Sequence, residues 1–226
     1  MEACDGLMIC FENVSKTVGS GRGAVSILNN VEVTFPAGMC VAIVGGQGSG
    51  KSTVLKMISG IDFPTRGKIR TNLDISWVAS QVQLENKMTV RQNIRFLGRL
   101  AGCSDLDEFE ANVRGVIDLG AKYYRSAGSL TTLERRALTV ATTLTIDFDV
   151  YLFDAFPSFR GLGNQDKLEE LFEKRRTDAG ILFCGNRQNL AKNCDAALLL
   201  HNRQLKYYSN VEESLKDFDR IIGEEN

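Results

Sequence analysis

Short, continuous apolar runs recur along the chain, and they predict strands that are buried on both faces. They cover residues 40–44 (CVAIV), 150–153 (VYLF), 181–184 (ILFC) and 196–200 (AALLL). Between two of these runs, residues 168–176 carry apolar positions at helical spacing. Buried strands that alternate with helices are typical of a mainly parallel sheet with helices on both faces. The pattern therefore predicts an α/β fold.

The N-terminal region has a different pattern. Residues 8–11 and 31–35 are short apolar or alternating runs. Between them, residues 15–23 (SKTVGSGRG) are rich in glycine and serine. This arrangement predicts an antiparallel β portion, with residues 15–23 as its turn region.

Residues 86 to about 128 are richer in helix signals. The stretch 104–108 (SDLDE) resembles a capped helix start. Apolar residues then follow at helical spacing, namely Leu106, Phe109, Val113, Val116 and Ile117. Further helices are predicted at 133–144 and 211–218. We interpret residues 86–128 as a helical insert in the α/β fold.

Composition and charge exclude several classes of function. The 226 residues carry a net charge of −1, which gives no electrostatic reason to expect binding to nucleic acid or to an anionic membrane surface. Six scattered cysteines and a single histidine argue against a Cys/His zinc site, and we expect reduced thiols in a cytosolic protein. No apolar run approaches the roughly 20 residues of a membrane helix, and the acidic start argues against a signal peptide. We expect a soluble chain, which leaves open that it docks onto a membrane protein.

A phosphate-binding motif follows the first buried run. Residues 45–52 (GGQGSGKS) match G-x-x-x-x-G-K-[ST], and residues 53–59 behind them predict a helix. Glycines let backbone N–H groups surround an anion, and the helix N-terminus adds its dipole. Lys51 is expected to reach the β- and γ-phosphates, and Ser52 to ligate Mg²⁺. The predicted nucleotide contacts are Gly45, Gly46, Gln47, Gly48, Ser49, Gly50, Lys51, Ser52 and Thr53. The alternative is a glycine-rich turn with a chance Lys-Ser, which the flanking strand and helix disfavour.

Longer stretches resemble the ATP-binding subunits of ABC transporters. They are FENVSK (11–16) and VAIVGGQGSGKSTVLKMISGIDFPTRGKI (41–69). Four further stretches are similar to the ATPases of capsular-polysaccharide exporters, namely ISW (75–77), MTVRQNIRFLGRLAG (88–102), FDVYLFD (148–154) and YYSNVEESL (207–215). The resemblance implies a P-loop NTPase with a RecA-like core, an antiparallel β subdomain and a helical subdomain at about 86–145 within one domain, 1–226. It also implies ATP and Mg²⁺ as ligands, a homo- or heterodimer of ATPase subunits, a membrane permease as partner, and a place on the cytoplasmic face of the inner membrane.

The resemblance also assigns metal contacts. Asp154 ends a buried run, where the family places a carboxylate that holds Mg²⁺ through water; the alternative is a strand-ending Asp in a turn. Gln81 lies near the family's Mg²⁺-contacting glutamine, and Gln83 is a rival because the spacing to residues 88–90 is about one residue short. An ordinary polar loop residue is an equal alternative for Gln81.

Positions that the family uses for hydrolysis carry other residues here. Ala155 stands where the family places its catalytic Glu, and a methyl group cannot accept a proton. Gly185 stands at the switch-histidine position, while the single histidine, His201, falls in a predicted surface turn. No catalytic residue is therefore predicted. Gly161 matches a dimer-contact Asp, and Val18 matches the aromatic residue that stacks on adenine.

The family's signature, Leu-Ser-Gly-Gly-Gln, corresponds to residues 130–134 (LTTLE). Thr131 retains a hydroxyl, but Thr132 and Leu133 replace the glycines that allow close backbone approach. Glu134 would bring negative charge near a triphosphate unless a cation such as Arg135 offsets it. The favoured interpretation is a capped helix start, Thr-x-x-Glu.

Three hypotheses follow from these replacements. The first is a subunit of a polysaccharide exporter that binds ATP–Mg²⁺ and hydrolyses it poorly or not at all. The second is a regulatory or scaffold protein without transport activity that uses nucleotide as a ligand. The third, the least favoured, is an active ATPase with an unrecognised base, for which Glu134, Asp147 and Asp149 are the nearby carboxylates.

Overall fold

The computed structural model describes residues 6–155 and 165–225. Gly161, for which a lost dimer contact was predicted, lies outside the described residues. The chain divides into two compact units, and each is treated by itself below. The first contains residues 6–78, 148–155 and 179–225, and the second contains residues 79–147 and 165–178.

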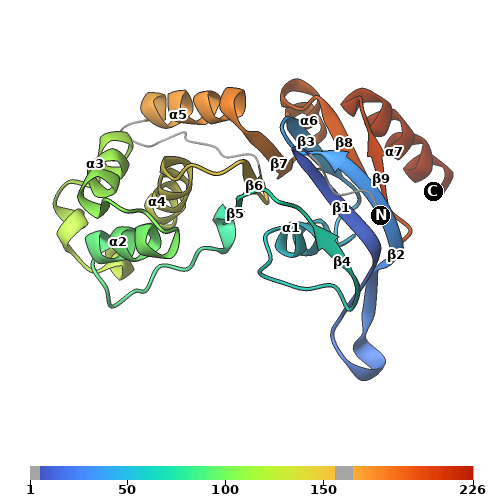
Figure 1. Ribbon diagram of the computed structural model, residues 1–226, viewed down its shortest axis with the longest axis horizontal. Coiled ribbons are helices and arrows are strands. Elements are labelled where there is room, and N and C mark those ends of the chain that lie inside the picture. Colours follow the sequence, from blue (N-terminus) through green and yellow to red (C-terminus); the bar gives the residue numbers. More distant parts are fainter. Residues whose placement is uncertain (1–5, 156–164, 226) are drawn as a thin grey trace. The chain divides into compact units, whose positions relative to one another are not determined.

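The first unit is built around a six-stranded sheet with the order β5-β6-β7-β3-β8-β9 (Figure 1). Its strands are β3 (Cys40–Val44), β5 (Ile75–Val78), β6 (Val150–Phe153), β7 (Gly180–Cys184), β8 (Ala196–His201) and β9 (Gln204–Tyr208). All neighbours are parallel except β8 and β9, which form an antiparallel hairpin. The four predicted apolar runs are β3, β6, β7 and β8, and every residue of β3, β6 and β7 is buried because these strands lie inside the sheet.

A three-stranded antiparallel sheet with the order β2-β1-β4 completes the first unit's strands. These are β1 (Met8–Val18), β2 (Val25–Pro36) and β4 (Arg66–Arg70). The predicted turn region 15–23 is wrong over its first four residues, because 15–18 belong to β1, where Ser15 pairs with β4 and 16–18 pair with β2. The polar Lys16 is buried there and the apolar Val18 is exposed, so no hydrophobic pattern marks this part of the strand, and the turn begins only at Gly19, whose φ is +84°.

The core of the first unit lies between the small sheet, helix α1 (Lys51–Ile58) and one face of the large sheet. Ile9 and Phe11 of β1, Leu55 of α1 and Ile43 of β3 belong to one buried cluster. Helix α7 (Val211–Glu225) packs on β3 and β8, next to the short helix α6 (Arg187–Asn193). This packing fixes the carboxyl ends of β3, β6 and β7, where the predicted phosphate and metal residues are found.

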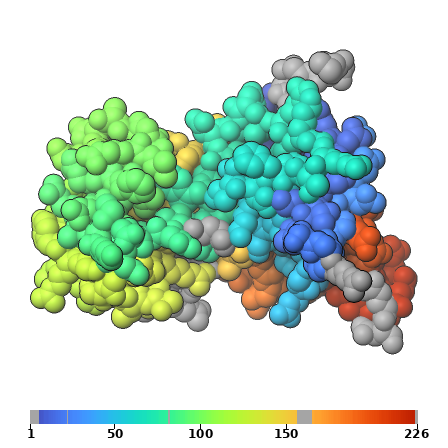
Figure 2. Space-filling view, turned by 90° about the horizontal axis from the view of Figure 1, so that it is seen from below, coloured from blue at the N-terminus to red at the C-terminus, as the bar shows by residue number. Residues whose placement is uncertain are grey.

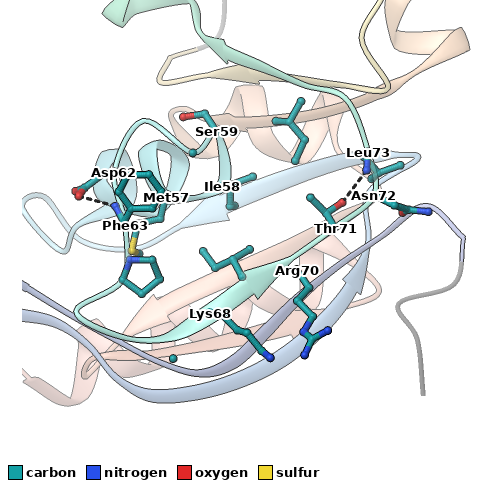
Figure 3. A pocket seen from close by; sticks show the side chains of 15 residues that line it. Met57, Ile58, Ser59, Asp62, Phe63, Lys68, Arg70, Thr71, Asn72 and Leu73 are labelled. Atoms are coloured by element: carbon teal, nitrogen blue, oxygen red, sulfur yellow. Dashed lines mark hydrogen bonds between the residues drawn. The ribbon is translucent and has the colours of Figure 1, made fainter. Parts of the chain in front are cut away.

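A groove of about 860 Å³ lies at the C-terminal end of α1, opposite the end that follows the phosphate loop (Figure 3). Its lining includes Ile58 of α1 and Ile69 of β4. The buried Lys16 ammonium anchors the loop beside it by donating to Asp62 Oδ1 at 2.5 Å and to the Phe63 carbonyl at 2.7 Å. On the face shown in Figure 2, this segment, drawn in cyan to turquoise, lies beside the blue N-terminal strands.

The second unit is helical. It contains α2 (Val90–Leu100), α3 (Leu106–Val116), α4 (Thr132–Thr145) and α5 (Gln165–Asp178), together with short 3-10 turns. The predicted helix start at 104–108 is confirmed, because the Asp105 carboxylate accepts hydrogen bonds from the backbone N–H groups of Asp107 and Glu108 at 2.9 Å. The predicted helix 133–144 is α4, one residue longer at each end.

Glu110 joins α3 to α2 through two arginines. Arg91 donates to its Oε1 at 2.9 Å and Arg95 to its Oε2 at 2.8 Å, while only 11% of the Glu110 side chain is exposed. Burial alone would raise the pKa of Glu110, but hydrogen bonds, among them those from the arginines, outweigh it and hold the pKa at about 2. The lowered pKa means that this carboxylate stabilises the folded chain most when it is ionised in both states.

Glu110→Gln is therefore expected to lower the stability at pH 7 by about 1–2 kcal/mol, because the arginines lose a charged partner. In the unfolded chain the carboxyl takes up its proton near its ordinary pKa of 4.5. In the folded chain its pKa is lowered to about 2. The difference between wild type and variant should therefore shrink as the pH falls from 5 toward 2. Thermal unfolding at pH 7 and pH 3 measures this, with the exposed Glu108→Gln on the same helix as control. Equal losses in both variants would contradict the assignment.

The cysteines agree with the predicted reduced state in part. Cys40, Cys103, Cys184 and Cys194 are thiols, but Cys10 is disulfide-bonded, which corrects the prediction for that residue. The spacing of the cysteines had given no signal for a pair. Within the described ranges, no helix combines the length and apolar character that crossing a membrane requires.

Candidate functional site: the phosphate loop and the end of β6

The phosphate loop connects β3 to α1, as predicted. Three of its glycines have positive φ, at Gly45 (+157°), Gly48 (+75°) and Gly50 (+106°). Gly50 is the N-cap of α1, and Lys51 is the first helical residue, so α1 begins two residues before the predicted start at Thr53. The α1 N-terminus thus opens directly onto the loop, which places backbone N–H groups and the helix dipole at one point.

Gly50 occupies a position in the loop where another residue would be strained and would collide with a neighbour. Its φ of +106° is strained for other residues, and an added Cβ would lie 2.2 Å from Ile27 Cγ2. Gly50→Ala is expected to lower the free energy of unfolding by about 1–3 kcal/mol and to weaken nucleotide binding. Gly46→Ala is the matched control, because an added Cβ there meets nothing within 4 Å. Thermal unfolding of both variants tests this, and equal melting temperatures would contradict it.

Lys51 and Ser49 provide the loop with a positive charge and a hydroxyl group that can bind an anion. The Lys51 ammonium donates to the Gly45 carbonyl at 2.8 Å and to the Gly46 carbonyl at 2.7 Å, so its charge lies over the loop. The Ser49 hydroxyl is buried and has no hydrogen-bond partner among the residues that the structure describes. A buried hydroxyl of this kind normally has a partner, and a phosphate oxygen would supply one. A bound phosphate therefore fits the residues present.

Ser52 and Asp154 meet across the first unit, 102 positions apart in sequence. The Ser52 hydroxyl donates to Asp154 Oδ1 at 2.9 Å. Asp154 directly follows β6, which places its carboxylate beside the start of α1. No group of three or more His, Cys, Asp or Glu in the described ranges is placed to hold a metal. The pair suits Mg²⁺, which commonly takes one or two protein oxygens and completes its shell with phosphates and water.

Cys184, at the end of β7, is a neighbour of this site that the sequence reasoning missed. Burial raises the pKa of the Cys184 thiol to about 12, the Asp154 carboxylate adds to the rise, and Lys51 opposes it. The ends of β6 and β7 and the phosphate loop therefore converge on one small region. Because its pKa is so high, Cys184 stays protonated and is no nucleophile at neutral pH.

Two of the predicted replacements lie near the same strand ends. Ala155 is exposed immediately after Asp154, so the side chain next to this carboxylate in the sequence is a methyl group. Gly185 directly follows β7, and an added Cβ would lie 3.4 Å from Leu190 Cδ2, an ordinary contact. The backbone at Gly185 thus has room for the Cβ of another residue. His201 is not in a turn as predicted, because it is the last residue of β8 and pairs with Gln204 of β9.

In the second unit, Thr131 and Glu134 form the predicted capped helix start. The Glu134 N–H donates to the Thr131 hydroxyl at 3.2 Å, and the Thr131 N–H donates to Glu134 Oε2 at 2.9 Å. Lys122 donates to both oxygens of Glu134, at 2.7 and 2.9 Å, and lowers its pKa.

A cation therefore does offset the charge of Glu134, but it is Lys122 rather than the suggested Arg135. Arg135 instead donates to Asn86 Oδ1 and to the Ala127 carbonyl, because its side chain leaves the helix on another side.

The predicted roles of three residues, Gln81, Gln83 and Val18, remain predictions. Gln81 ends the 3-10 turn Ala79–Gln81, and its side chain lies outside the described part of the chain. Its rival Gln83 is exposed in the loop that follows. Val18 is the last residue of β1 and is 44% exposed. Since both glutamines belong to the second unit, their position relative to Ser52 stays an open prediction.

A parallel sheet, a phosphate loop between β3 and α1, and a strand-ending Asp bonded to the loop's Ser define a P-loop NTPase. The chain belongs to the ABC transporter family, whose family model matches residues 28–156. The predicted fold class is thereby confirmed.

Named relatives agree with this assignment. The polysialic acid transport ATP-binding protein KpsT of Escherichia coli is 30% identical over 219 residues, covering 95% of this chain and 100% of KpsT. The capsule polysaccharide export ATP-binding protein CtrD of Neisseria meningitidis serogroup B is 28% identical over 216 residues, covering 95% and 100%. A solved dimeric ATP-binding cassette in a post-hydrolysis state, bound to ADP and Pi, shares the fold with a TM-score of 0.71 at 20% identity, covering 89% of this chain and 98% of that chain.

Proposed function

We propose that the chain is the nucleotide-binding subunit of an ABC transporter for polysaccharide export, and that it binds ATP–Mg²⁺ but hydrolyses ATP poorly or not at all. The transport class is supported by KpsT and CtrD, whose names specify polysialic acid and capsule polysaccharide and whose whole length this chain covers. The observation that carries the proposal is that an intact phosphate loop and Ser52–Asp154 pair adjoin an exposed alanine.

The retained residues would each bind a different part of ATP–Mg²⁺. Lys51 would move its ammonium from the Gly45 and Gly46 carbonyls to phosphate oxygens, which carry more negative charge. Ser52 would ligate Mg²⁺ directly, and Asp154 would hold it through water. Bound Mg²⁺ would neutralise phosphate charge.

The replaced residues argue against efficient turnover. The methyl group of Ala155 can neither orient nor deprotonate water, and loss of a general base typically costs about 10² to 10⁴ in rate. At the signature segment, the Glu134 carboxylate caps the N-terminus of α4 and would compete with a phosphate for the same N–H groups. The two effects would act on different steps, the attack of water and the completion of a partner's site.

The three carboxylates of the third hypothesis have other partners. Asp147 forms an ion pair with Arg175, Asp149 accepts from the Asp74 N–H at 2.8 Å, and Glu134 is held by Lys122. These contacts support poor hydrolysis rather than an unrecognised base. An ATPase that uses one of them would first have to break an existing contact.

The proposal extends to partners and location. We infer a homo- or heterodimer of ATPase subunits, which the dimeric solved relative supports. We also infer docking to a membrane permease on the cytoplasmic face of the inner membrane, in keeping with the export functions named for KpsT and CtrD.

Purification from native membranes tests the transporter assignment. The expected result is that a permease co-purifies with the chain and that the eluted complex binds ATP–Mg²⁺ by calorimetry. ATP binding without a permease would instead favour the scaffold hypothesis. A chain without affinity for ATP–Mg²⁺ would overturn both.

A further inference from the structure

Cys40 and Cys194 bring two thiols together from distant parts of the sequence. Cys40 is the first residue of β3, and Cys194 directly follows α6. Their sulfur atoms are 3.7 Å apart, and the residues are only 5% and 8% exposed. The pair lies in the first unit, at the opposite end of β3 from the phosphate loop, so nucleotide binding makes no use of it.

The backbone around the two thiols is already tied together. The Asp195 N–H donates to the Cys40 carbonyl at 2.9 Å, and the Cys40 N–H donates to Asp195 Oδ2 at 3.1 Å. The Asp195 carbonyl in turn accepts from the Val211 N–H at the start of α7, at 3.0 Å. These bonds hold the two segments side by side, where the sulfur atoms of Cys40 and Cys194 are already in contact.

Packing alone would explain two small buried side chains in contact. A disulfide needs a sulfur–sulfur distance of about 2.05 Å, so the atoms must approach by roughly 1.7 Å, a distance within the range of side-chain rotation. Because the backbone already brings these two residues together, the pair offers what an oxidisable dithiol requires, namely a second thiol within immediate reach of the first.

We propose that Cys40 and Cys194 are a redox-sensitive dithiol that a peroxide converts to a disulfide. One sulfur attacks the peroxide, the O–O bond breaks, and a sulfenic acid and one water form. The second sulfur then attacks the sulfenic sulfur, the S–O bond breaks, and a second water leaves. Two thiols and one hydrogen peroxide thus give one disulfide and two waters. The proposal does not rest on the transport function.

The product would join the strand that leads into the phosphate loop to the segment between α6 and β8. Residues 40 to 194 would become a closed covalent loop that contains the phosphate loop, the described parts of the second unit and Asp154. Because the Asp195 hydrogen bonds already fix this contact, the disulfide should preserve the native arrangement of β3 and β8.

The test is mass spectrometry on the full chain. The reduced, folded protein is treated with hydrogen peroxide, unfolded, alkylated and digested with trypsin. The expected product is peptide 23–51, which holds Cys40, linked to peptide 193–203, which holds Cys194. The link should disappear with reductant and in Cys194→Ser. The same treatment of the unfolded chain should give several-fold less of this link, since its thiols are no longer held together.

A second probe reports the two thiols without oxidation. Phenylarsine oxide, whose trivalent arsenic bridges neighbouring thiols, should protect both Cys40 and Cys194 from later alkylation in the wild type, and should leave Cys40 unprotected in Cys194→Ser. The partly exposed Cys103 serves as internal control for access of the peroxide. The proposal is overturned if Cys103 is consumed while Cys40 and Cys194 remain separately alkylated, or if the folded chain gives no more link than the unfolded one.

Discussion

Replacing Lys51 by alanine is expected to lower the affinity of the chain for ATP–Mg²⁺ by about 10²-fold, measured by calorimetry. The ammonium lies over the phosphate loop, where it now donates to the Gly45 and Gly46 carbonyls. Two charge-assisted hydrogen bonds to phosphate contribute about 3 kcal/mol or more, and each 1.4 kcal/mol corresponds to a factor of ten.

The matched control is Lys56→Ala, which removes the same charge from the last turn of the same helix. This variant should bind within about twofold of wild type, because a charge at the far end of the helix contributes little to phosphate binding. Melting temperatures of both variants show whether the loop remains folded. Wild-type affinity in Lys51→Ala, with an unchanged melting temperature, would contradict the assignment of the phosphate loop.

Ala155→Glu alone is expected to leave ATP turnover near the wild-type level, although it restores the carboxylate that the family uses. The α4 N-terminus would still be capped by Glu134, and Gly185 would still lack a side chain. Adding Gly185→His and replacing residues 131–134 by Ser-Gly-Gly-Gln should then raise turnover by about 10²-fold or more, since a base and its partners act together.

Phosphate release by the purified variants measures this difference. Ala155→Gln is the control, since it has the size of Glu without a basic carboxylate. Rapid turnover in Ala155→Glu that Ala155→Gln lacks would mean that the remaining machinery is intact. That result would contradict the proposal that several functions are lost together.

Elements with a clear hydrophobic signature could be predicted from the sequence. The run CVAIV became β3, because it is central in a sheet covered on both faces. Strand β4 (RGKIR) could not be predicted in this way, since it lies at the edge of the small sheet and its charged side chains face solvent. Helix α6 (RQNLAKN) was missed for a similar reason, because only Leu190 is buried.

The site was predictable where a local motif determines it. The sequence motif predicted the loop and Ser52, and the buried run before Asp154 predicted a carboxylate at a strand end. The contacts of Cys184 and Lys122 depend instead on which strands and helices become neighbours. Cys184 lies close enough to Asp154 to be affected by its charge, because β7 lies next to β6 in the sheet. Lys122 donates to Glu134 from a 3-10 turn, and the hydrophobic pattern of the sequence does not predict that turn.

The fate of bound ATP tests the central claim most directly. The purified chain is mixed with labelled ATP and Mg²⁺, the complex is recovered, and the bound nucleotide is identified over time. The account predicts that wild type retains ATP, with little or no ADP beyond that in a protein-free sample, and that Lys51→Ala retains no nucleotide. Rapid conversion of the bound ATP to ADP by the wild-type chain, or recovery of wild type without nucleotide, would contradict it.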